Sequence, residues 1–241
     1  MNKFVFCTLN LVVLFLSACG DDSGSATRPS EESLSSVALS SSSRILDGGL
    51  ESSSSALQSS SSVTLDIVDP ASVVKGTFSD SRDGQTYKTL IIGTQTWMGE
   101  NLNFETADSY CHENKAENCD KYGRYYTWNA AMNACPDGWH LPTRDEFEIL
   151  ISAVGGAEIA GKILKSTEGW YNNGNGTDAY GYSILPTGVK GGGVGRQAHF
   201  WTSTEFTSTY ASYVYLSHDY NHVAVYDNSK EEGKYIRCVK D

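Results

Sequence analysis

The feature that most constrains this chain is the uneven distribution of its aromatic residues. Of 27 aromatic residues, 24 lie between residues 76 and 241, as do 19 of the 23 glycines. Residues 20–70 contain 18 serines and no aromatic residue. Because large apolar side chains supply most of the area that a core buries, only residues 76–241 are expected to fold as a globular domain. This segment of 166 residues is long enough to bury about 70% of its unfolded surface in one core.

The start of the chain has the pattern of a bacterial lipoprotein signal peptide. Lys3 precedes an almost unbroken apolar run over residues 4–16, which is too short to span a bilayer as a permanent helix. The Leu-Ser-Ala-Cys sequence that ends at Cys19 resembles the lipobox, in which the cysteine is lipidated. We therefore predict a signal peptide at 1–18 and a lipid anchor at Cys19. An ordinary secretory signal with an incidental cysteine is the alternative.

Residues 19–75 are predicted to form a disordered, serine-rich tether behind the anchor. They include three runs of four serines, and their scattered apolar residues follow neither the strand period nor the helix period. Such a segment cannot bury enough apolar area to offset its ordering entropy. Asp21 and Asp22 resemble the surface-export signal of some lipoproteins. We therefore expect a lipid-anchored protein of the bacterial outer membrane, exposed at the cell surface. A linker that presents serines for glycosylation is the other interpretation of the tether.

The charge balance and the absence of several motifs exclude some functions. The formal net charge is −11 and there is no basic block, so the chain lacks the electrostatic pattern of a nucleic-acid-binding protein. The sequence contains no Gly-x-Ser-x-Gly motif and no phosphate-binding loop. We therefore expect no cofactor and no nucleic-acid partner.

The segment 76–241 has the pattern of an α+β domain. Residues 88–92 and 95–98 are predicted to form a hairpin. Thr143 and Glu146 have the spacing of a capping box at the start of a helix, and a second helix is expected at 157–165. Further strands are expected at 182–185, 199–203, 213–216, 222–226 and 235–239, and a short helix at 126–134. We therefore predict two or three short helices packed on a small antiparallel sheet, with long loops rich in glycine and asparagine.

Four cysteines of this segment are expected to form two disulfides. An even number of cysteines in an exported chain favours oxidation, and their spacing does not match a zinc site or a catalytic redox pair. Three pairings are possible. We favour Cys111–Cys119, which would close a polar loop, and Cys135–Cys238, which would tie the helical half to the last strand.

Five motifs follow one another in this segment. They are G-T-Q-T-W-M-G-E-N-L (93–102), Y-G-R-Y-Y-T-W (122–128), C-P-D-G-W-H-L-P-T (135–143), F-W-T-S-T-E (200–205) and I-R-C-V-K-D (236–241). Together they resemble the Fibrobacter succinogenes major paralogous domain, a family of exported bacterial modules without an established activity. The resemblance covers nearly all of residues 76–241, and it implies a variant of the C-type-lectin-like fold.

The resemblance to the lectin-like fold does not extend to the calcium site of the C-type lectins. Those lectins use Glu-Pro-Asn or Gln-Pro-Asp together with Trp-Asn-Asp, and neither set is present. Tyr226, Asp227 and Asn228 are only loosely similar to the second motif. His218 and His222 flank a predicted hairpin tip, where exposed polar residues are common. We therefore predict no metal site.

An enzymatic activity is the second interpretation of the family resemblance. Residues 141–148 resemble a helix of the formylglycine-generating enzymes, which share the lectin-like fold and use reactive cysteines near the C-terminal end. Here the only nearby cysteine is Cys238, which we expect in a disulfide. We therefore predict no catalytic residue.

The predicted ligand-binding residues lie in one loop rich in glycine and asparagine. Four of the five tryptophans have apolar neighbours and are expected in the core: Trp97, Trp128, Trp139 and Trp201. The fifth, Trp170, is followed by amides, and an aromatic ring beside hydrogen-bonding groups suits a sugar ring. The predicted site consists of Trp170, Tyr171, Asn172, Asn173, Asn175 and Asp178. The alternative is that Trp170 packs into a small core beneath its own loop.

These features favour a surface lipoprotein that binds without catalysis. Its expected partners are the membrane, through the lipid anchor, and a carbohydrate or other cell-surface polymer. An enzyme that acts on polysaccharide or protein is the second hypothesis. A structural component of the envelope is the third, and a homo-oligomer with Tyr213 and Tyr215 buried between chains would favour it.

Overall fold

The computed structural model describes residues 66–189 and 191–241, and all of them belong to one compact unit. The predicted signal peptide, Cys19 and the tether up to residue 65 lie outside the described residues. The packed part begins before residue 76. The amide of Val68 donates to the carbonyl of Ala153 (2.8 Å), and the hydroxyl of Tyr180 donates to the carbonyl of Val68 (2.5 Å). A short 3-10 turn, η1 (Pro70–Ser72), then leads into the first strand.

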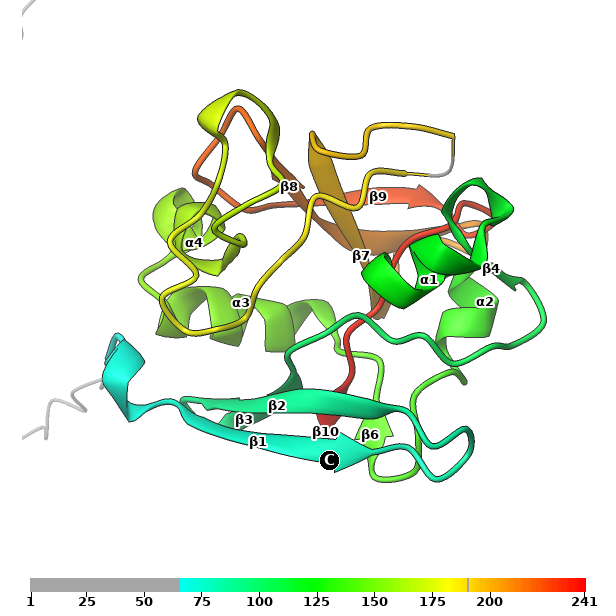
Figure 1. Ribbon diagram of the computed structural model, residues 1–241, viewed down its shortest axis with the longest axis horizontal. Helices are drawn as coiled ribbons and strands as arrows, with labels where there is room; N and C mark the ends of the chain where they lie inside the picture. Colours follow the sequence, from blue (N-terminus) through cyan, green and yellow to red (C-terminus); the bar gives the residue numbers. More distant parts are fainter. Residues whose placement is uncertain (1–65, 190) are drawn as a thin grey trace, which may run out of the picture. The chain divides into compact units, whose positions relative to one another are not determined.

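The first sheet has five antiparallel strands in the order β1-β2-β3-β10-β6. They are β1 (Val74–Ser79), β2 (Thr86–Ile92), β3 (Gln95–Met98), β10 (Val239–Lys240) and β6 (Trp139–His140). The predicted hairpin of residues 88–92 and 95–98 is confirmed as β2 and β3. It turns at Gly93, whose φ of 61° suits a glycine. The last strand inserts between β3 and β6, so both ends of the described unit meet in one sheet (Figure 1).

The second sheet has three antiparallel strands in the order β7-β8-β9. They are β7 (Gln197–Glu205), β8 (Tyr210–Ser217) and β9 (Ala224–Ser229), and a separate two-stranded ladder joins β4 (Ser109–Tyr110) to β5 (Tyr125–Tyr126). The predicted strands at 199–203 and 213–216 are confirmed. The strand expected at 222–226 begins two residues later, at Ala224.

Two predicted strands are wrong or largely wrong. Residues 182–185 form only a single bridge, between Ile184 and Lys165. Of residues 235–239, only Val239 belongs to a strand, while Tyr235 makes one bridge to Phe200. Residues 235–239 are all buried, and in 182–185 the apolar Tyr182 and Ile184 are buried while Ser183 and Leu185 are half-buried. Their alternation of apolar residues therefore reflects packing between the two sheets rather than pairing within one.

The described residues contain four short α-helices and two further 3-10 turns. These are α1 (Ala116–Tyr122), α2 (Trp128–Ala131), α3 (Arg144–Ala153), α4 (Ala157–Leu164), η2 (His112–Asn114) and η3 (Tyr171–Asn173). The capping box of α3 is confirmed. The Oγ1 of Thr143 accepts from the amide of Glu146 (3.1 Å), and Glu146 Oε2 accepts from the amide of Thr143 (2.7 Å). The α+β class is therefore confirmed, with α1 as a helix that the sequence analysis missed.

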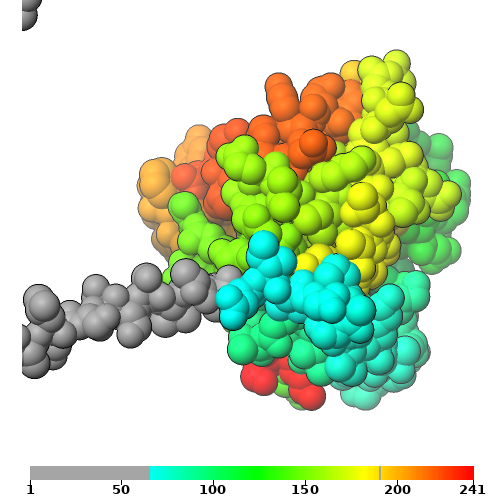
Figure 2. All heavy atoms as spheres, turned by 90° about the vertical axis from the view of Figure 1, so that its left-hand side faces the viewer, coloured from blue at the N-terminus to red at the C-terminus, as the bar shows by residue number. Residues whose placement is uncertain are grey.

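The main core lies where α3 packs between the two sheets. Phe147 and Leu150 of α3 share one buried cluster with Trp97 of β3 and Val214 of β8, and the rings of Trp97 and Phe147 lie 4.9 Å apart. In Figure 2 the green residues of the helices separate the cyan N-terminal strands from the orange strands. The four tryptophans expected in the core are all buried, at 0–8% exposure. No helix in the described ranges is both long enough and apolar enough to span a membrane.

Both favoured disulfides are present. Cys111 pairs with Cys119 across the start of α1, and Cys135 pairs with Cys238 across 103 residues of sequence. The carbonyl of Cys238 also accepts from the amide of Met98 (3.0 Å). The second disulfide therefore holds the C-terminal segment beside β3. Arg237, the residue before Cys238, is thereby held in position.

Candidate functional site

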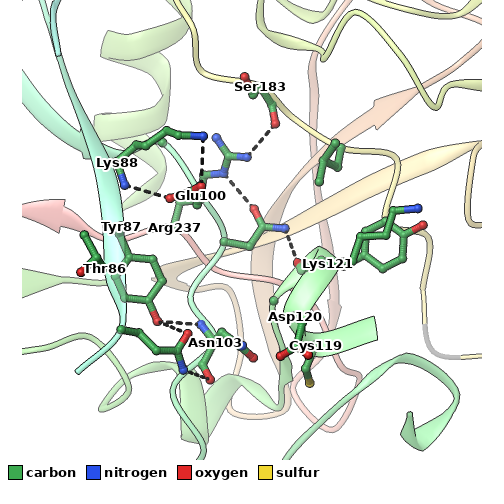
Figure 3. Close-up of a pocket in the computed structure, with 16 residues that line it drawn as sticks. Thr86, Tyr87, Lys88, Glu100, Asn103, Cys119, Asp120, Lys121, Ser183 and Arg237 are labelled. Carbon is green, nitrogen blue, oxygen red and sulfur yellow. Dashed lines mark hydrogen bonds and ion pairs between the residues drawn. The ribbon is translucent and has the colours of Figure 1, made fainter. Parts of the chain in front are cut away.

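A pocket of about 330 Å³ opens between the first sheet and α1 (Figure 3). Its walls come from five segments that are far apart in the sequence. They are the start of β2, residues 99–103 after β3, the end of α1, the loop at 183–185 and Arg237. Because each wall comes from a different part of the fold, tertiary packing rather than local sequence creates this pocket.

Arg237 forms the buried end of the pocket, with only 2% of its surface exposed. Its Nε donates to Oδ1 of Asn101 (2.9 Å), and its two terminal nitrogens donate to the carbonyls of Tyr182 and Ser183, the latter at 3.1 Å. Because the guanidinium group is planar and rigid, it fixes the directions of these three hydrogen bonds. Arg237 therefore ties the loop after β3 to the loop at 182–183, and its burial lowers its pKa.

Asn101 links this arginine to α1. Its Nδ2 donates to the carbonyl of Tyr122, the last residue of the helix (2.8 Å), and its side chain is buried. The next residue, Gly123, has a φ of 78° and lies so close that a Cβ atom there would meet Leu102 O and Asn101 Cβ at 2.8 Å. A glycine is therefore required for α1 to approach the pocket loop. The Cys111–Cys119 disulfide also holds this helix in place.

The rim carries charges of both signs. Lys88 and Glu100 lie on one side of the pocket, and Asp120 and Lys121 come from α1 on the other (Figure 3). One oxygen of Glu100 contacts Nζ of Lys88 (3.3 Å) and the other accepts from the Lys88 amide (2.8 Å). Both oxygens of Glu100 are therefore engaged by one residue, whereas Asp120 has no ion pair within the described part of the chain.

Neutral polar groups complete the lining. The hydroxyl of Tyr87 accepts from the amide of Asn103 (3.1 Å) and donates to Gln85 (3.4 Å). Burial raises the pKa of Tyr87 to about 12, so this hydroxyl keeps its proton. The buried Oδ1 of Asn103 accepts no hydrogen bond from residues 66–189 or 191–241. The lining thus offers amides, a hydroxyl and charged groups, which suits a small polar ligand.

The structure does not present Trp170 as the exposed stacking surface that the sequence analysis predicted. Its side chain is 5% exposed and belongs to the main core. Its indole N–H donates to Ser166 Oγ and to the carbonyl of Ile184, both at 3.1 Å, and Nζ of Lys165 lies 4.9 Å above its ring. The prediction failed because the indole N–H finds partners inside the loop, which then closes over the ring. Trp170 is buried, as the alternative expected, but in the main core rather than in a separate small core of the loop.

The other predicted loop residues divide into two groups. Asn175 accepts from the amide of Trp170 (3.0 Å), and Asp178 accepts from the amide and the hydroxyl of Ser183 (2.7 and 2.5 Å). These two side chains hold the loop's own backbone, and Asp178 thereby helps to place a pocket residue. Tyr171, 50% exposed, lies at the surface together with Asn172 and Asn173. Binding by these three residues remains a prediction.

Sequence reasoning missed the pocket, although its central residues lie in the motifs that carry the family resemblance. Asn101 is the second-last residue of the first motif, Gly123 lies in the second and Arg237 in the last. Arg237, a charged residue between Ile236 and Cys238, was the one available signal. No local pattern shows that the three positions meet.

A second polar and aromatic cluster lies on β7 and β8. His199 stacks on Tyr213, with ring centroids 5.3 Å apart, and Nζ of Lys234 lies 4.2 Å above the same tyrosine ring. Burial and the nearby Lys234 lower the pKa of His199 to about 3, and burial lowers that of Lys234 to about 8. Both groups are almost completely buried, at 7% and 2% exposure, so this cluster offers no open pocket.

The residues considered for metal binding or cysteine chemistry do not form such sites. His218 pairs with Asp219 (3.1 Å), while His222 stacks on Tyr220. Within the described ranges, no group of three or more His, Cys, Asp or Glu residues could hold a metal ion. Cys238 is in a disulfide and therefore carries no thiol.

Comparison with known proteins gives one match. Residues 90–240 match the family model of the Fibrobacter succinogenes major domain. No curated protein and no solved structure matches the chain. The match includes most residues of the pocket, among them Glu100, Asn101, Lys121 and Arg237. The chain therefore belongs to the Fibrobacter succinogenes major domain family.

Proposed function

We propose that this chain is a surface-anchored binding module that takes a saccharide unit in the pocket around Asn101 and Arg237. The observation that carries the proposal is the convergence of polar side chains from five segments on one cavity, held in place by hydrogen bonds. Preformed cavities with a few oriented polar groups are the usual sites for small ligands. The pocket replaces the loop of Trp170 as the main candidate.

A saccharide fits the chemistry of this lining. Its hydroxyls donate to carboxylates and amide oxygens, such as those of Asp120 and Asn103, and accept from ammonium groups such as that of Lys121. The half-buried ring of Tyr122 adds an apolar face at the wall. A volume of about 330 Å³ corresponds to the lower end of ligand pockets and suits one or two sugar rings.

Binding without catalysis is favoured by the state of the carboxylates. Hydrolysis of a glycosidic bond uses two carboxyl groups, one of which gives or takes a proton. Here both oxygens of Glu100 are engaged by Lys88, which leaves Asp120 alone on the opposite wall. An enzyme that acts on polysaccharide is the alternative, and release of reducing ends from bound glycans would favour it.

The predicted anchor and tether are part of this proposal. A lipid anchor at Cys19 and a serine-rich tether would hold the domain at the surface of the outer membrane, where it could reach a polymer. Cys19→Ser should release the protein from membranes or block its processing. A variant that stays in the membrane fraction at the normal processed size would contradict the anchor.

The experiment that tests the function is a glycan array. The full chain, purified in detergent and labelled with a fluorophore, is applied to an array of oligosaccharides and extracellular polymers. Saturable binding to a defined group of glycans is expected. The same array, analysed afterwards for cleaved products, separates binding from hydrolysis. No binding to any glycan would contradict the proposal.

A second candidate function is binding of another protein through the second sheet. Tyr226 of β9 is 50% exposed and lies near Tyr213 and Tyr215, with ring centroids 6.1 and 5.9 Å away. Tyrosine clusters of this kind are common in protein interfaces. A concentration-dependent homo-oligomer that Tyr226→Ser dissociates would favour this function.

A further inference from the structure

We propose that the ligand of this pocket carries a carboxylate group, which pairs with the guanidinium of Arg237. This inference rests on the saccharide-binding function proposed above and makes its ligand class narrower. It predicts that the bound saccharide is acidic, such as one that contains a uronic acid.

Arg237 is a buried cation whose hydrogen-bond partners are all neutral. Its three hydrogen bonds go to Asn101 Oδ1 and to the carbonyls of Tyr182 and Ser183. Among residues 66–189 and 191–241, no carboxylate lies within 4.0 Å of its nitrogens. A guanidinium has five N–H donors, so two are left over.

Burying this cation without a direct anionic partner costs free energy. A buried charge is unfavourable unless it is paired, and an arginine does not lose its proton to avoid the cost. The rings of Tyr182 and Phe200, 4.5 and 5.6 Å from the guanidinium carbon, stabilise the cation only in part. Asp178 and Glu100 act on Arg237 only from beyond ion-pair distance, so an anionic group that enters the pocket would form the direct pair that is missing.

The lining of the pocket as a whole carries more positive than negative groups. Three cations line the pocket, Arg237, Lys88 and Lys121, against two carboxylates, Glu100 and Asp120. Glu100 is already neutralised by Lys88. The pocket is thus slightly positive on a chain with a formal net charge of −11. A positive pocket on an acidic protein favours an anionic ligand by electrostatic attraction.

A carboxylate matches the chemistry of a guanidinium that has N–H donors left over. The planar guanidinium binds carboxylates through parallel N–H donors, which a neutral hydroxyl cannot match in strength. Arg237 also holds two loops together, so replacing it would test folding as well as binding. The test therefore changes the ligand and leaves Arg237 in place.

The experiment compares matched ligands on the wild-type full chain. Oligosaccharides of galacturonic and glucuronic acid are printed beside their carboxyl-reduced forms, which differ only by having an alcohol in place of each carboxylate. The acidic forms are expected to bind at least about tenfold more tightly, with the difference shrinking as salt rises. Equal binding of the two forms would overturn this inference and leave saccharide binding intact. Binding of neutral glycans alone would also overturn this inference and leave saccharide binding intact.

Two matched lysine variants test whether the preference for the acidic ligand comes from this pocket. Lys88 and Lys115 are both exposed lysines paired with a glutamate, but only Lys88 lines the pocket. Lys88→Ala is expected to weaken binding of the acidic form about fivefold more than binding of the reduced form, and Lys115→Ala to change neither. Identical behaviour of the two variants would overturn the assignment of the carboxylate to this pocket. Absence of any glycan binding would overturn the proposed function itself, and this inference with it.

Discussion

Asn101 accepts a 2.9 Å hydrogen bond from Nε of Arg237, a residue 136 positions later in the chain. The same amide group donates to the carbonyl of Tyr122 at the end of α1. One buried side chain thus joins the C-terminal segment to the helix on the opposite wall of the pocket. This side chain is therefore one of the non-local contacts that set the shape of the candidate site.

Removing this contact should cost both stability and binding. Asn101→Ala leaves the Nε–H of Arg237 and the carbonyl of Tyr122 without their partner, which should lower the free energy of unfolding by about 2–3 kcal/mol. Thermal denaturation followed by circular dichroism measures the change. Asn129→Ala, on the exposed side of α2, is the control and should melt like the wild type. A variant at Asn101 that melts at the wild-type temperature would show that the contact is not structural.

The burial of Trp170 gives a second prediction. Trp170→Ala removes a 5%-exposed indole from the main core and should destabilise the fold by about 3–5 kcal/mol. Its neighbour Tyr171 is 50% exposed, so Tyr171→Ala should change stability by no more than about 0.5 kcal/mol. Chemical denaturation of both variants makes the comparison. Similar stabilities for the two would contradict the core position of Trp170.

The two disulfides should differ in their contribution to stability. In the chain-entropy model, a loop of 103 residues gives about 4.7 kcal/mol and a loop of 8 residues about 2.5 kcal/mol. Replacing Cys135 and Cys238 by serine should therefore lower the melting temperature more than replacing Cys111 and Cys119. Each double variant is compared with the wild type under non-reducing conditions. The opposite order would mean that the short loop matters more to the folded state than the entropy model allows.

His140 should make stability depend on pH. Burial lowers the pKa of His140, but its ring contacts Asp241 (2.6 Å) and Glu146 (2.8 Å), and these bonds outweigh burial and raise its pKa above 6.5. Burial raises the pKa of Glu146, but bonds from Thr143 and His140 outweigh it and lower that pKa below 4.5.

The sign of the effect follows from these two directions. A pKa raised by folding stabilises the protein below about pH 6.5 and is lost as the pH rises through the folded-state value, whereas the lowered pKa of Glu146 stabilises above about pH 4.5. The melting temperature of the wild type should therefore fall between pH 6 and pH 8 by more than that of His140→Gln. His222→Gln is the control. Parallel pH profiles for wild type and His140→Gln would rule out this ion-pair group as the cause.

The sequence predicted best where the physics is local. The hairpin at Gly93 and the capping box of Thr143 and Glu146 each depend on residues a few positions apart, and both are present. The prediction of a strand at 235–239 is wrong because the alternating apolar residues pack between two sheets, while the backbone does not pair along one sheet. Alternation reports burial on one face, and it cannot report which neighbour covers that face.

The candidate site was less predictable than the fold for the same reason. The loop around Trp170 has the composition of a ligand-binding loop, yet its amide and carboxylate groups are used to close the loop over the indole. The pocket brings together Asn101, Gly123 and Arg237, and no pattern of spacing connects them. Only the folded chain shows that Arg237 lies buried beside an opening.

The account depends most on ligand binding in this pocket. The most direct test is a nuclear magnetic resonance titration of the isotopically labelled full chain with a glycan selected on the array. We predict that the largest shifts occur at the backbone amides of residues 99–103, at Gly123 and at the Nε–H of Arg237, all of which lie at the pocket. Saturable shifts confined to the loop of Tyr171 or to the tyrosines of β8 and β9, with the Nε–H of Arg237 unmoved, would contradict it.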